Sequence, residues 1–360
     1  MKVVDLEFTP IFIPYKNPYH WAQGITEGAE LILVKLRTDK GIEGYGESIA
    51  TPSSKAILSF LDQAKKLIIG RDIYENDRIF KDVYQYLFQA HGTCSAPRFA
   101  SQVLCGIEIA FWDAKGKEFG KPVYQLLGGK QHEALQYFGF AQGESANEIA
   151  KDAKELAQSG YKVIYIKVGK KNEEEDIEII KKTRLAIGKN RRLRIDPNEH
   201  WPILKMRRLI ERVKDYNIEF IEQPCDAESL IALSHAQQKS LIPIAADQSV
   251  FTIHDAFNIC KINAADMLTL GIHETGGISN FKKLGELNKK ESPRLDIAIK
   301  FLRMIGIKVV RKKDDIKIYG NPNLNLNGNY HIKNFLKDHR IFMMSCVAAL
   351  TLGGNWKIND

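Results

Sequence analysis

The chain has 360 residues, of which 44% are hydrophobic and 27% are charged, so it is long enough for about two domains of ordinary globular composition. The formal net charge of +8 is consistent with a nucleic-acid partner, an anionic substrate or a surface rich in Lys. The basic residues are scattered, without an arginine-rich arm or an RNA-type aromatic motif, so we favour the Lys-rich surface and expect no nucleic-acid partner.

The cysteine pattern argues against a disulfide framework or a zinc knuckle. The five cysteines are odd in number and widely spaced, and no CxxC pair occurs: Cys94, Cys105, Cys225, Cys260 and Cys346. The N-terminal segment is typical of a strand broken by prolines, not of a signal peptide, and no apolar run is long enough to span a membrane. These features favour a reducing compartment, and we expect a cytoplasmic protein without a membrane partner.

The first region, residues 1–130, has the pattern of an α+β domain. Alternating residues predict three antiparallel strands, with a TDKG turn between the last two: Val3–Phe12, Leu31–Arg37 and Ile42–Glu47. Apolar residues three and four apart then predict helices over Ser54–Ile69, Asp77–Ala90 and Phe99–Phe119. The pair Gly128 and Gly129 marks the end of this region, and strands followed by helices favour an α+β fold.

The second region, residues 131–282, repeats a strand and a helix. Each predicted strand is short and apolar, most end in a charged or polar residue, and an amphipathic helix follows each: Val163–Val168, Leu193–Ile195, Glu219–Glu222, Ile244–Ala246 and Met267–Leu270. Repeated βα units predict a parallel sheet with crossover helices.

The spacing of the strand ends favours a (β/α) barrel over an open sheet. The intervals between consecutive members of the series are 29, 26, 25 and 24 residues: Lys167, Asp196, Glu222, Asp247 and Gly271. One strand, one helix and two loops need about this length. Catalytic residues of such barrels lie at the C-terminal ends of the strands, where these polar residues fall.

Three carboxylates, Asp196, Glu222 and Asp247, end successive strands and are the candidate ligands of Mg²⁺. Hard divalent cations prefer carboxylate oxygens and water, and a cation here could clamp a substrate carboxylate and neutralise an enolate. Lys167 lies one strand earlier; near a dication and partly desolvated, it would have a depressed pKa and could act as a base. A single strand-end carboxylate is more often a helix cap or a surface charge, but three in register with a Lys make coincidence much less plausible.

Several segments resemble the enolase superfamily in its mandelate racemase and muconate lactonizing branch. They are LRIDPNEHW (193–201), IEFIEQPCD (218–226), PIAADQS (243–249), IYIKVG (164–169), HETGGIS (273–279), TDKGIEGYGES (38–48), GIEIAFWDAKGKEFGKPVYQLLGG (106–129) and the segment after Tyr137. The resemblance covers residues 1–280. It implies a capping α+β domain before a TIM-type barrel, Mg²⁺ on Asp196, Glu222 and Asp247, and abstraction of a proton next to a carboxylate of a small-molecule substrate. The expected enzyme is a lyase or isomerase, and the expected assembly is a homo-oligomer.

The chain departs from this pattern at two strands. Where many members carry Lys-x-Lys, it has Tyr165 before Lys167, and Tyr165 either orients Lys167 or the substrate, or is a packed aromatic. After the strand Met267–Leu270, which corresponds to the sixth strand of the family's barrel, Gly271 stands where the family often places a Lys or Asp. His273 and Glu274 lie nearby and are possible substitutes, although a lone His is more often structural. Without a second base, one-sided dehydration or epimerisation is favoured over two-base racemisation.

Substrate specificity is assigned to residues of the capping domain and of the third barrel strand. Tyr19, His20 and Trp21 lie where the specificity loop of this family would lie, with ordinary loop packing as the alternative. Asn198, two residues after Asp196, is the further candidate for substrate contact.

The third region, residues 283–360, breaks the barrel rhythm. SPRLDIAIKFLRMIG predicts a helix begun by Ser292 and Pro293 and ended by Gly306; a hairpin over Ile307–Arg311 and Ile316–Tyr319 and a helix near 340–352 follow. The segments GELNKKESPRL (285–295) and KDHRIFMMSCVAAL (337–350) resemble 3-phosphoshikimate 1-carboxyvinyltransferase (EPSP synthase). That resemblance implies an anion site on Lys290, Arg294 and Arg340.

Two resemblances in one chain predict a chimera: a barrel truncated after its sixth strand and joined to an unrelated α/β tail. Three hypotheses follow. The first is an Mg²⁺-dependent acid-sugar dehydratase or epimerase, whose turnover the truncation could impair. The second is a carboxyvinyltransferase, which is disfavoured because half of that parent is missing. The third is a catalytically inactive fusion, because exposed strand edges are a liability.

Overall fold

The computed structural model describes residues 1–22, 24–89, 96–290, 302–303, 307–312, 315–319, 326–332 and 355–358. The chain divides into two compact units, Met1–Leu284 and Gly285–Asp360. No helix in these described ranges is long and apolar enough to cross a membrane. The boundary predicted near residue 130, inside the first unit, stays a prediction.

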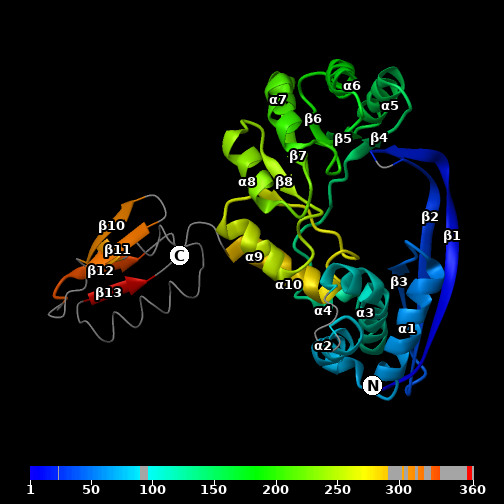
Figure 1. The fold of residues 1–360 in the computed structure, drawn as a ribbon. Helices are drawn as coiled ribbons and strands as arrows, with labels where there is room; N and C mark the ends of the chain where they lie inside the picture. The colour runs from blue at the N-terminus through cyan, green and yellow to red at the C-terminus, as the bar shows by residue number, and fades with distance from the viewer. Residues whose placement is uncertain are drawn as a thin grey trace. The chain divides into compact units, whose positions relative to one another are not determined.

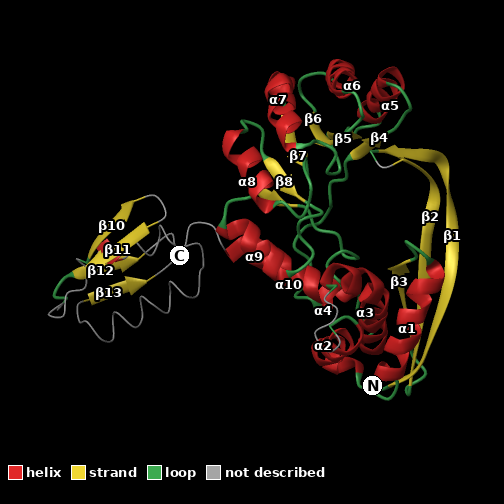
Figure 2. Cartoon of the chain, viewed as in Figure 1, coloured by secondary structure: helices red, strands yellow, loops and turns green. Residues whose placement is uncertain are grey.

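The first unit opens with a three-stranded antiparallel sheet, as the alternating sequence predicted. Its strands, in the order β1-β2-β3, are β1 (Val3–Trp21), β2 (Gly24–Thr38) and β3 (Glu43–Ile49). Strands β1 and β2 are longer than predicted and lie side by side over most of their length (Figure 2). The residues Tyr19, His20 and Trp21, predicted in a loop, therefore lie in the paired end of β1, opposite Gly24–Thr26.

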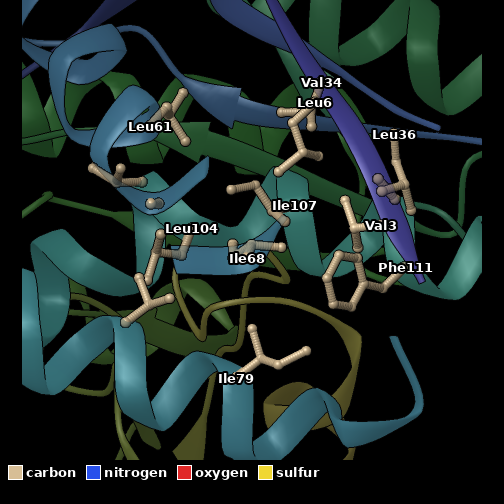
Figure 3. Packing of buried hydrophobic residues seen from close by; sticks show 14 of the residues in the cluster. Val3, Leu6, Val34, Leu36, Leu61, Ile68, Ile79, Leu104, Ile107 and Phe111 are labelled. Atoms are coloured by element: carbon tan, nitrogen blue, oxygen red, sulfur yellow. The ribbon is translucent and has the colours of Figure 1, made fainter. Parts of the chain in front are cut away.

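Helices cover one face of this sheet and form the core of the capping region. They are α1 (Ser54–Ile68), η1 (Ile73–Glu75), α2 (Asn76–Leu87), α3 (Pro97–Phe119) and α4 (Val123–Leu126), and the three long ones match the predicted helices within a few residues. Alternate residues of β2 are buried (Ile32, Val34, Leu36), as are residues of α1 at helical spacing (Ile57, Leu61, Ala64, Ile68). Figure 3 shows several of these side chains packed together with residues of β1, α2 and α3.

Two glycines allow β3 and α3 to touch backbone to backbone. A Cβ on Gly46 of β3 would lie 2.0 Å from the carbonyl oxygen of Gly106 of α3, and a Cβ on Gly106 would lie 2.5 Å from Ser48 Oγ. Only residues without side chains fit such a contact. The Ser48 hydroxyl donates to Val103 O at 2.7 Å and accepts from Gly106 N at 3.1 Å, so the polar groups of this contact are paired.

The rest of the first unit is the predicted alternation of strands and helices. The strands form one parallel sheet in the order β4-β5-β6-β7-β8-β9, with bounds β4 (Gly139–Ala141), β5 (Val163–Lys167), β6 (Arg192–Asp196), β7 (Ile218–Glu222), β8 (Ile244–Ala246) and β9 (Met267–Leu268). The helices are α5 (Ala146–Gln158), α6 (Glu173–Ile187), α7 (Ile203–Val213), η3 (Lys214–Tyr216), α8 (Leu230–Lys239), α9 (Ile253–Lys261) and α10 (Ile278–Lys290). Figure 1 shows α5–α8 on the outer side of the strands.

Parallel strands covered by helices are buried on both faces, which explains why β5 and β8 are almost continuously apolar. Capping boxes at Ser145 and Thr252 begin α5 and α9 and set where two of the crossover helices start. Among the described residues, β4 and β9 are the two ends of the sheet. That the barrel is truncated after six strands stays a prediction.

The second unit contains two small two-stranded sheets among its described residues. The predicted hairpin is confirmed: β10 (Lys308–Lys312) pairs antiparallel with β11 (Asp315–Tyr319). Strand β12 (Asn329–Ile332) pairs parallel with β13 (Asn355–Ile358). Arg294 and Arg340, with most of their two predicted helices, lie outside the described residues, and Lys290 is described only as the last residue of α10.

Candidate active site

The predicted lysine and the three predicted carboxylates lie at one edge of the parallel sheet. Lys167, Asp196 and Glu222 are the last residues of β5, β6 and β7, and Asp247 directly follows β8. Lys167 and Asp196 are register partners, so their side chains leave neighbouring strands at the same level. The three carboxylates are 0%, 6% and 8% exposed in the order of the chain. Buried carboxylates need partners, because burying an unpaired charge is costly.

Asp196 is the most heavily bonded of these carboxylates. Its Oδ2 forms an ion pair with Lys167 Nζ and accepts a hydrogen bond from Tyr165 OH at 2.5 Å. Its Oδ1 accepts from the backbone N–H of Asn198 at 2.7 Å. Tyr165 and Lys167 reach the same oxygen because residues two apart on a strand lie on one face. Tyr165 is therefore bonded to the candidate site and is not only a packed aromatic.

The pKa of Lys167 is shifted in the opposite direction to the one predicted. Burial acts to lower this pKa, but the charge of Asp196 and the hydrogen bond to it outweigh burial, so the pKa of Lys167 is raised. The prediction of a depressed pKa placed a dication beside Lys167, whereas the side chain here is paired with a carboxylate.

Glu222 and Asp247 are held in surroundings that disfavour their charged forms. Burial is the largest cause, and neighbouring carboxylates add to it: the pKa of Glu222 is raised to about 8 and that of Asp247 to about 9. The charge of Asp196 raises the pKa of Glu222, and the charge of Glu274 raises the pKa of Asp247. A positive charge among these groups would offset their repulsion.

The carboxylates share this edge without forming a closed set of ligands. Within the part of the chain that the structure describes, no three Asp, Glu, His or Cys side chains lie close enough to hold a metal ion together. Both oxygens of Asp196 are engaged by Lys167, Tyr165 and the backbone of Asn198. The metal site thus stays a prediction. Whether these residues suit a metal ion depends on the oxygen atoms that they and their neighbours offer.

The donor set fits a hard cation. Asn198 Oδ1 and Gln248 Oε1 are buried oxygens that have no hydrogen-bond partner. Asn198 is two residues after Asp196, and Gln248 directly follows Asp247, so both unpaired oxygens belong to the loops that carry the candidate ligands. Hard cations such as Mg²⁺ take oxygen ligands, and carboxylates are the side chains that most often bind it. Asn198, predicted to contact substrate, thereby lies beside the carboxylates with its oxygen unpaired.

The three aromatic candidates of β1 divide into two groups. The ring of Tyr19 lies 5.3 Å from that of Phe140 in β4, which lies 5.4 Å from the ring of Tyr165. Burial raises the pKa of Tyr19 against the opposing charge and hydrogen bond of Lys167, so Tyr19 is close to the candidate base. His20 and Trp21 instead line a neighbouring pocket of about 660 Å³ together with Gly169 and His200.

His273 and Glu274, the possible substitutes at the sixth strand, differ in exposure. The side chain of His273 is 55% exposed and that of Glu274 is 17% exposed, with 3.9 Å between His273 Nε2 and Glu274 Oε1. Glu274 also contributes to the raised pKa values of Glu222 and Asp247. The charge of Glu274 therefore acts on the candidate carboxylates, while His273 faces solvent.

Gln223 was missed by the sequence analysis. It is completely buried and its Oε1 accepts from the backbone N–H groups of Asp247 at 3.0 Å and of Ser249 at 3.1 Å. Its Nε2 donates to Cys225 O and to Ser249 Oγ. Gln223 thus fixes the backbone that carries Asp247. The available signal was a polar residue directly after Glu222 in the segment IEFIEQPCD.

Comparison with known proteins is consistent across sequence and structure. Residues 7–128 match the family model of the mandelate racemase / muconate lactonizing enzyme N-terminal domain, and residues 148–292 match the enolase C-terminal domain-like model. The L-Ala-D/L-Glu epimerase of Clostridium acetobutylicum is 30% identical over 292 residues, which cover 79% of this chain and 78% of that protein.

Two further relatives differ in the chemistry that their names describe. Arabinonate dehydratase of Saccharolobus solfataricus is 25% identical over 263 residues, or 72% of this chain and 70% of that protein. The crystal structure of the dipeptide epimerase of Cytophaga hutchinsonii, complexed with Mg and the dipeptide D-Ala-L-Val, has a TM-score of 0.73 and 26% identity, covering 81% of this chain and 77% of that one.

Proposed function

We propose that Lys167 is the catalytic base of this enzyme, because the chain belongs to the mandelate racemase and muconate lactonizing branch of the enolase superfamily. It is an isomerase or lyase that works by Mg²⁺-dependent removal of a proton next to a carboxylate. One observation carries this proposal: Lys167 ends the strand beside Asp196, at the edge where Glu222 and Asp247 also lie. The cation ligands that we propose are Asp196, Glu222 and Asp247.

The chain's own residues supply binding and proton transfer. In the structure, Asp196 holds Lys167 in its charged form, which cannot accept a proton. Asp196, Glu222 and Asp247 would hold the cation, and its charge would oppose the attraction of Asp196 for the ammonium of Lys167. Lys167 acts as a base once its ammonium has lost a proton. Tyr165 keeps its hydrogen bond to Asp196 and limits how far the carboxylate can move. Mg²⁺, when bound, supplies the positive charge that stabilises an enolate.

Two substrate classes are candidates. Acid sugars were favoured by the sequence resemblance, and one relative is named for the dehydration of arabinonate. Dipeptides and related amino-acid derivatives are named by the relatives of 28% to 30% identity. Both classes carry the required α-proton next to a carboxyl or carbonyl carbon, so the proposed chemistry is common to them.

The test is exchange of the α-proton with solvent deuterium, followed by NMR for L-Ala-L-Glu and for arabinonate in the presence of MgCl₂. Lys167→Ala is expected to lower exchange of the epimer whose proton faces Lys167 by roughly 10²–10⁴-fold. Lys162→Ala is the matched control, because Lys162 is exposed and directly precedes β5, at the end of the strand opposite to Lys167. Asp196→Asn is expected to abolish the Mg²⁺-dependent rise of the melting temperature. A wild type that exchanges neither probe and binds no Mg²⁺ would refute the proposal.

Three sequence predictions stay proposals. The origin of residues 283–360 in a 3-phosphoshikimate 1-carboxyvinyltransferase rests on the motifs of the tail, and the truncation of the barrel rests on the end of the barrel rhythm, while the family models cover residues 7–128 and 148–292. The homo-oligomer is tested by light scattering. Cooperative unfolding with a Mg²⁺-dependent midpoint would count against an inactive fusion.

A further inference from the structure

We infer that Glu274 is the second acid/base of the active site and acts on the face of the substrate opposite to Lys167, so that the enzyme interconverts two epimers of a dipeptide. This inference rests on the proposed function. It assigns to a carboxylate the role that Gly271 cannot perform.

The carboxylate of Glu274 occupies the position of the missing side chain at Gly271. A Cβ on Gly271 would lie 2.6 Å from Glu274 Oε2 and 3.1 Å from Glu274 Cδ. Gly271 does not have a positive φ, so the glycine is not required by the local backbone conformation. The absence of a side chain is instead what lets the carboxylate of Glu274 lie over the end of the sixth strand.

The loop that carries Glu274 is held rigidly from both sides. The buried Thr275 donates its hydroxyl to Gly271 O at 3.0 Å, and Gly277 N donates to Ile272 O at 2.8 Å. After the loop, the N-terminus of α10 is bound by Glu108 of α3, whose Oε2 accepts from Ile278 N at 2.7 Å. These bonds fix the backbone from which the side chain of Glu274 starts, and a catalytic group needs such a fixed base to be positioned.

Lys167 and Glu274 flank the carboxylates from two sides. Lys167 ends β5 and Glu274 follows β9, with β6, β7 and β8 between them in the sheet. Lys167 contacts Asp196, the first carboxylate of the series, whereas the charge of Glu274 acts on Asp247, the last, and on Glu222. A substrate held at the middle of this series has one proton-transfer group on each side.

The chemistry balances without an oxidant or a co-reactant. For one epimer, the carboxylate of Glu274 takes the α-proton: the C–H bond breaks, its electron pair remains on the substrate as an enolate, and an O–H bond forms. The ammonium of Lys167 then gives a proton to the opposite face, which forms the new C–H bond and leaves a neutral amine. For the other epimer the two groups exchange roles, and exchange with water restores both protonation states.

The experiment follows L-Ala-L-Glu and L-Ala-D-Glu in D₂O with MgCl₂. Wild type is expected to place deuterium in both dipeptides and to interconvert them. Glu274→Gln is expected to exchange only the epimer whose proton faces Lys167 and to interconvert them roughly 10²–10⁴-fold more slowly. Lys167→Ala is expected to exchange only the other epimer. Glu228→Gln, an exposed carboxylate in the loop after β7, is the control and is expected to behave as wild type.

A second variant tests the position of Glu274 without removing it. In Gly271→Ala the added methyl group meets the end of a flexible side chain, so the protein is expected to fold while the carboxylate of Glu274 is displaced. Interconversion should then fall, whereas the Mg²⁺-dependent shift of the melting temperature should remain in this variant and in Glu274→Gln.

Four outcomes would overturn the inference. The first is unchanged interconversion in Glu274→Gln. The second is loss of both exchange reactions together with the Mg²⁺ shift, which would make Glu274 a ligand or a structural residue. The third is loss of interconversion in His273→Asn with retention in Glu274→Gln, which would move the role to His273. The fourth is wild-type exchange of arabinonate but of neither dipeptide, which leaves the proposed function standing; a wild type that exchanges no probe and binds no Mg²⁺ contradicts both.

Discussion

Replacing Glu108 by Gln should destabilise the protein far more than the loss of an ordinary carboxylate. Glu108 lies on α3 with 2% of its surface exposed. Its Oε2 accepts from Ile278 N at 2.7 Å, and its Oε1 accepts from Trp112 Nε1 at 2.8 Å, Asn76 Nδ2 at 3.1 Å and Ser279 N at 3.2 Å. The side chain of Glu108 thus joins the capping helices α2 and α3 to the start of α10.

The magnitude follows from the donors that surround this carboxylate. An amide that keeps its oxygen at the Oε1 position places an NH₂ group against the N–H of Ile278, so one buried donor loses its acceptor, at a cost of about 1–3 kcal/mol. The bonds that remain lose the negative charge of their acceptor, which removes roughly another 1 kcal/mol. We expect Glu108→Gln to lower the free energy of unfolding by about 2–4 kcal/mol.

Urea denaturation followed by tryptophan fluorescence measures this loss, since the indole of Trp112 is itself bonded to Glu108. Glu155→Gln is the matched control: Glu155 is exposed on α5, so its replacement should change stability by less than about 0.5 kcal/mol. A Glu108→Gln protein within about 0.5 kcal/mol of wild type would show that the carboxylate does not hold the two parts together.

Two further predictions concern the carboxylates of the site. Because burial raises the pKa values of Glu222 to about 8 and Asp247 to about 9, the folded metal-free protein binds more protons than the unfolded chain, and its stability should fall as pH rises from about 5 through that range. Mg²⁺ competes with those protons, so its stabilising shift of the melting temperature should grow over the same range; an equal shift at both ends would contradict the assignment. Gln223→Leu should cost about 2–5 kcal/mol, because it leaves the buried N–H groups of Asp247 and Ser249 unpaired. It should also weaken Mg²⁺ binding in calorimetry, whereas Gln158→Leu, at an exposed position of α5, should do neither.

Local patterns were sufficient for most of the secondary structure. The period of two along β2 and the helical period along α1 predicted the type of each element, and in the structure the apolar residues of each pattern are buried on one face, which is the physical cause of both patterns. The ends of β1 and β2 could not be predicted in this way. Their last pairs, such as Tyr19 with Thr26, are held by cross-strand contacts that leave no alternation in the sequence.

In the candidate site, too, the positions of the residues could be predicted from the sequence, but their electrostatics could not. The even spacing of Lys167, Asp196, Glu222 and Asp247 was enough to place them at one edge of a parallel sheet, since each strand and helix uses a similar length of chain. The pKa of Lys167 was not predictable, because its direction depends on whether burial or the carboxylate of Asp196 prevails, and only the distance between the two groups decides that.

By itself, the sequence determined the βα alternation, the residues at the strand ends and the family's chemistry, because these depend on periodicity and on motifs that are continuous in the chain. The tertiary structure alone decided that Gln223 supports Asp247, that Glu108 binds the start of α10, and that the carboxylate of Glu274 lies over Gly271. Each of these is a contact at a distance of a few ångströms whose partners are set by the packing of separate elements, and such contacts leave no periodic signal for a sequence to carry.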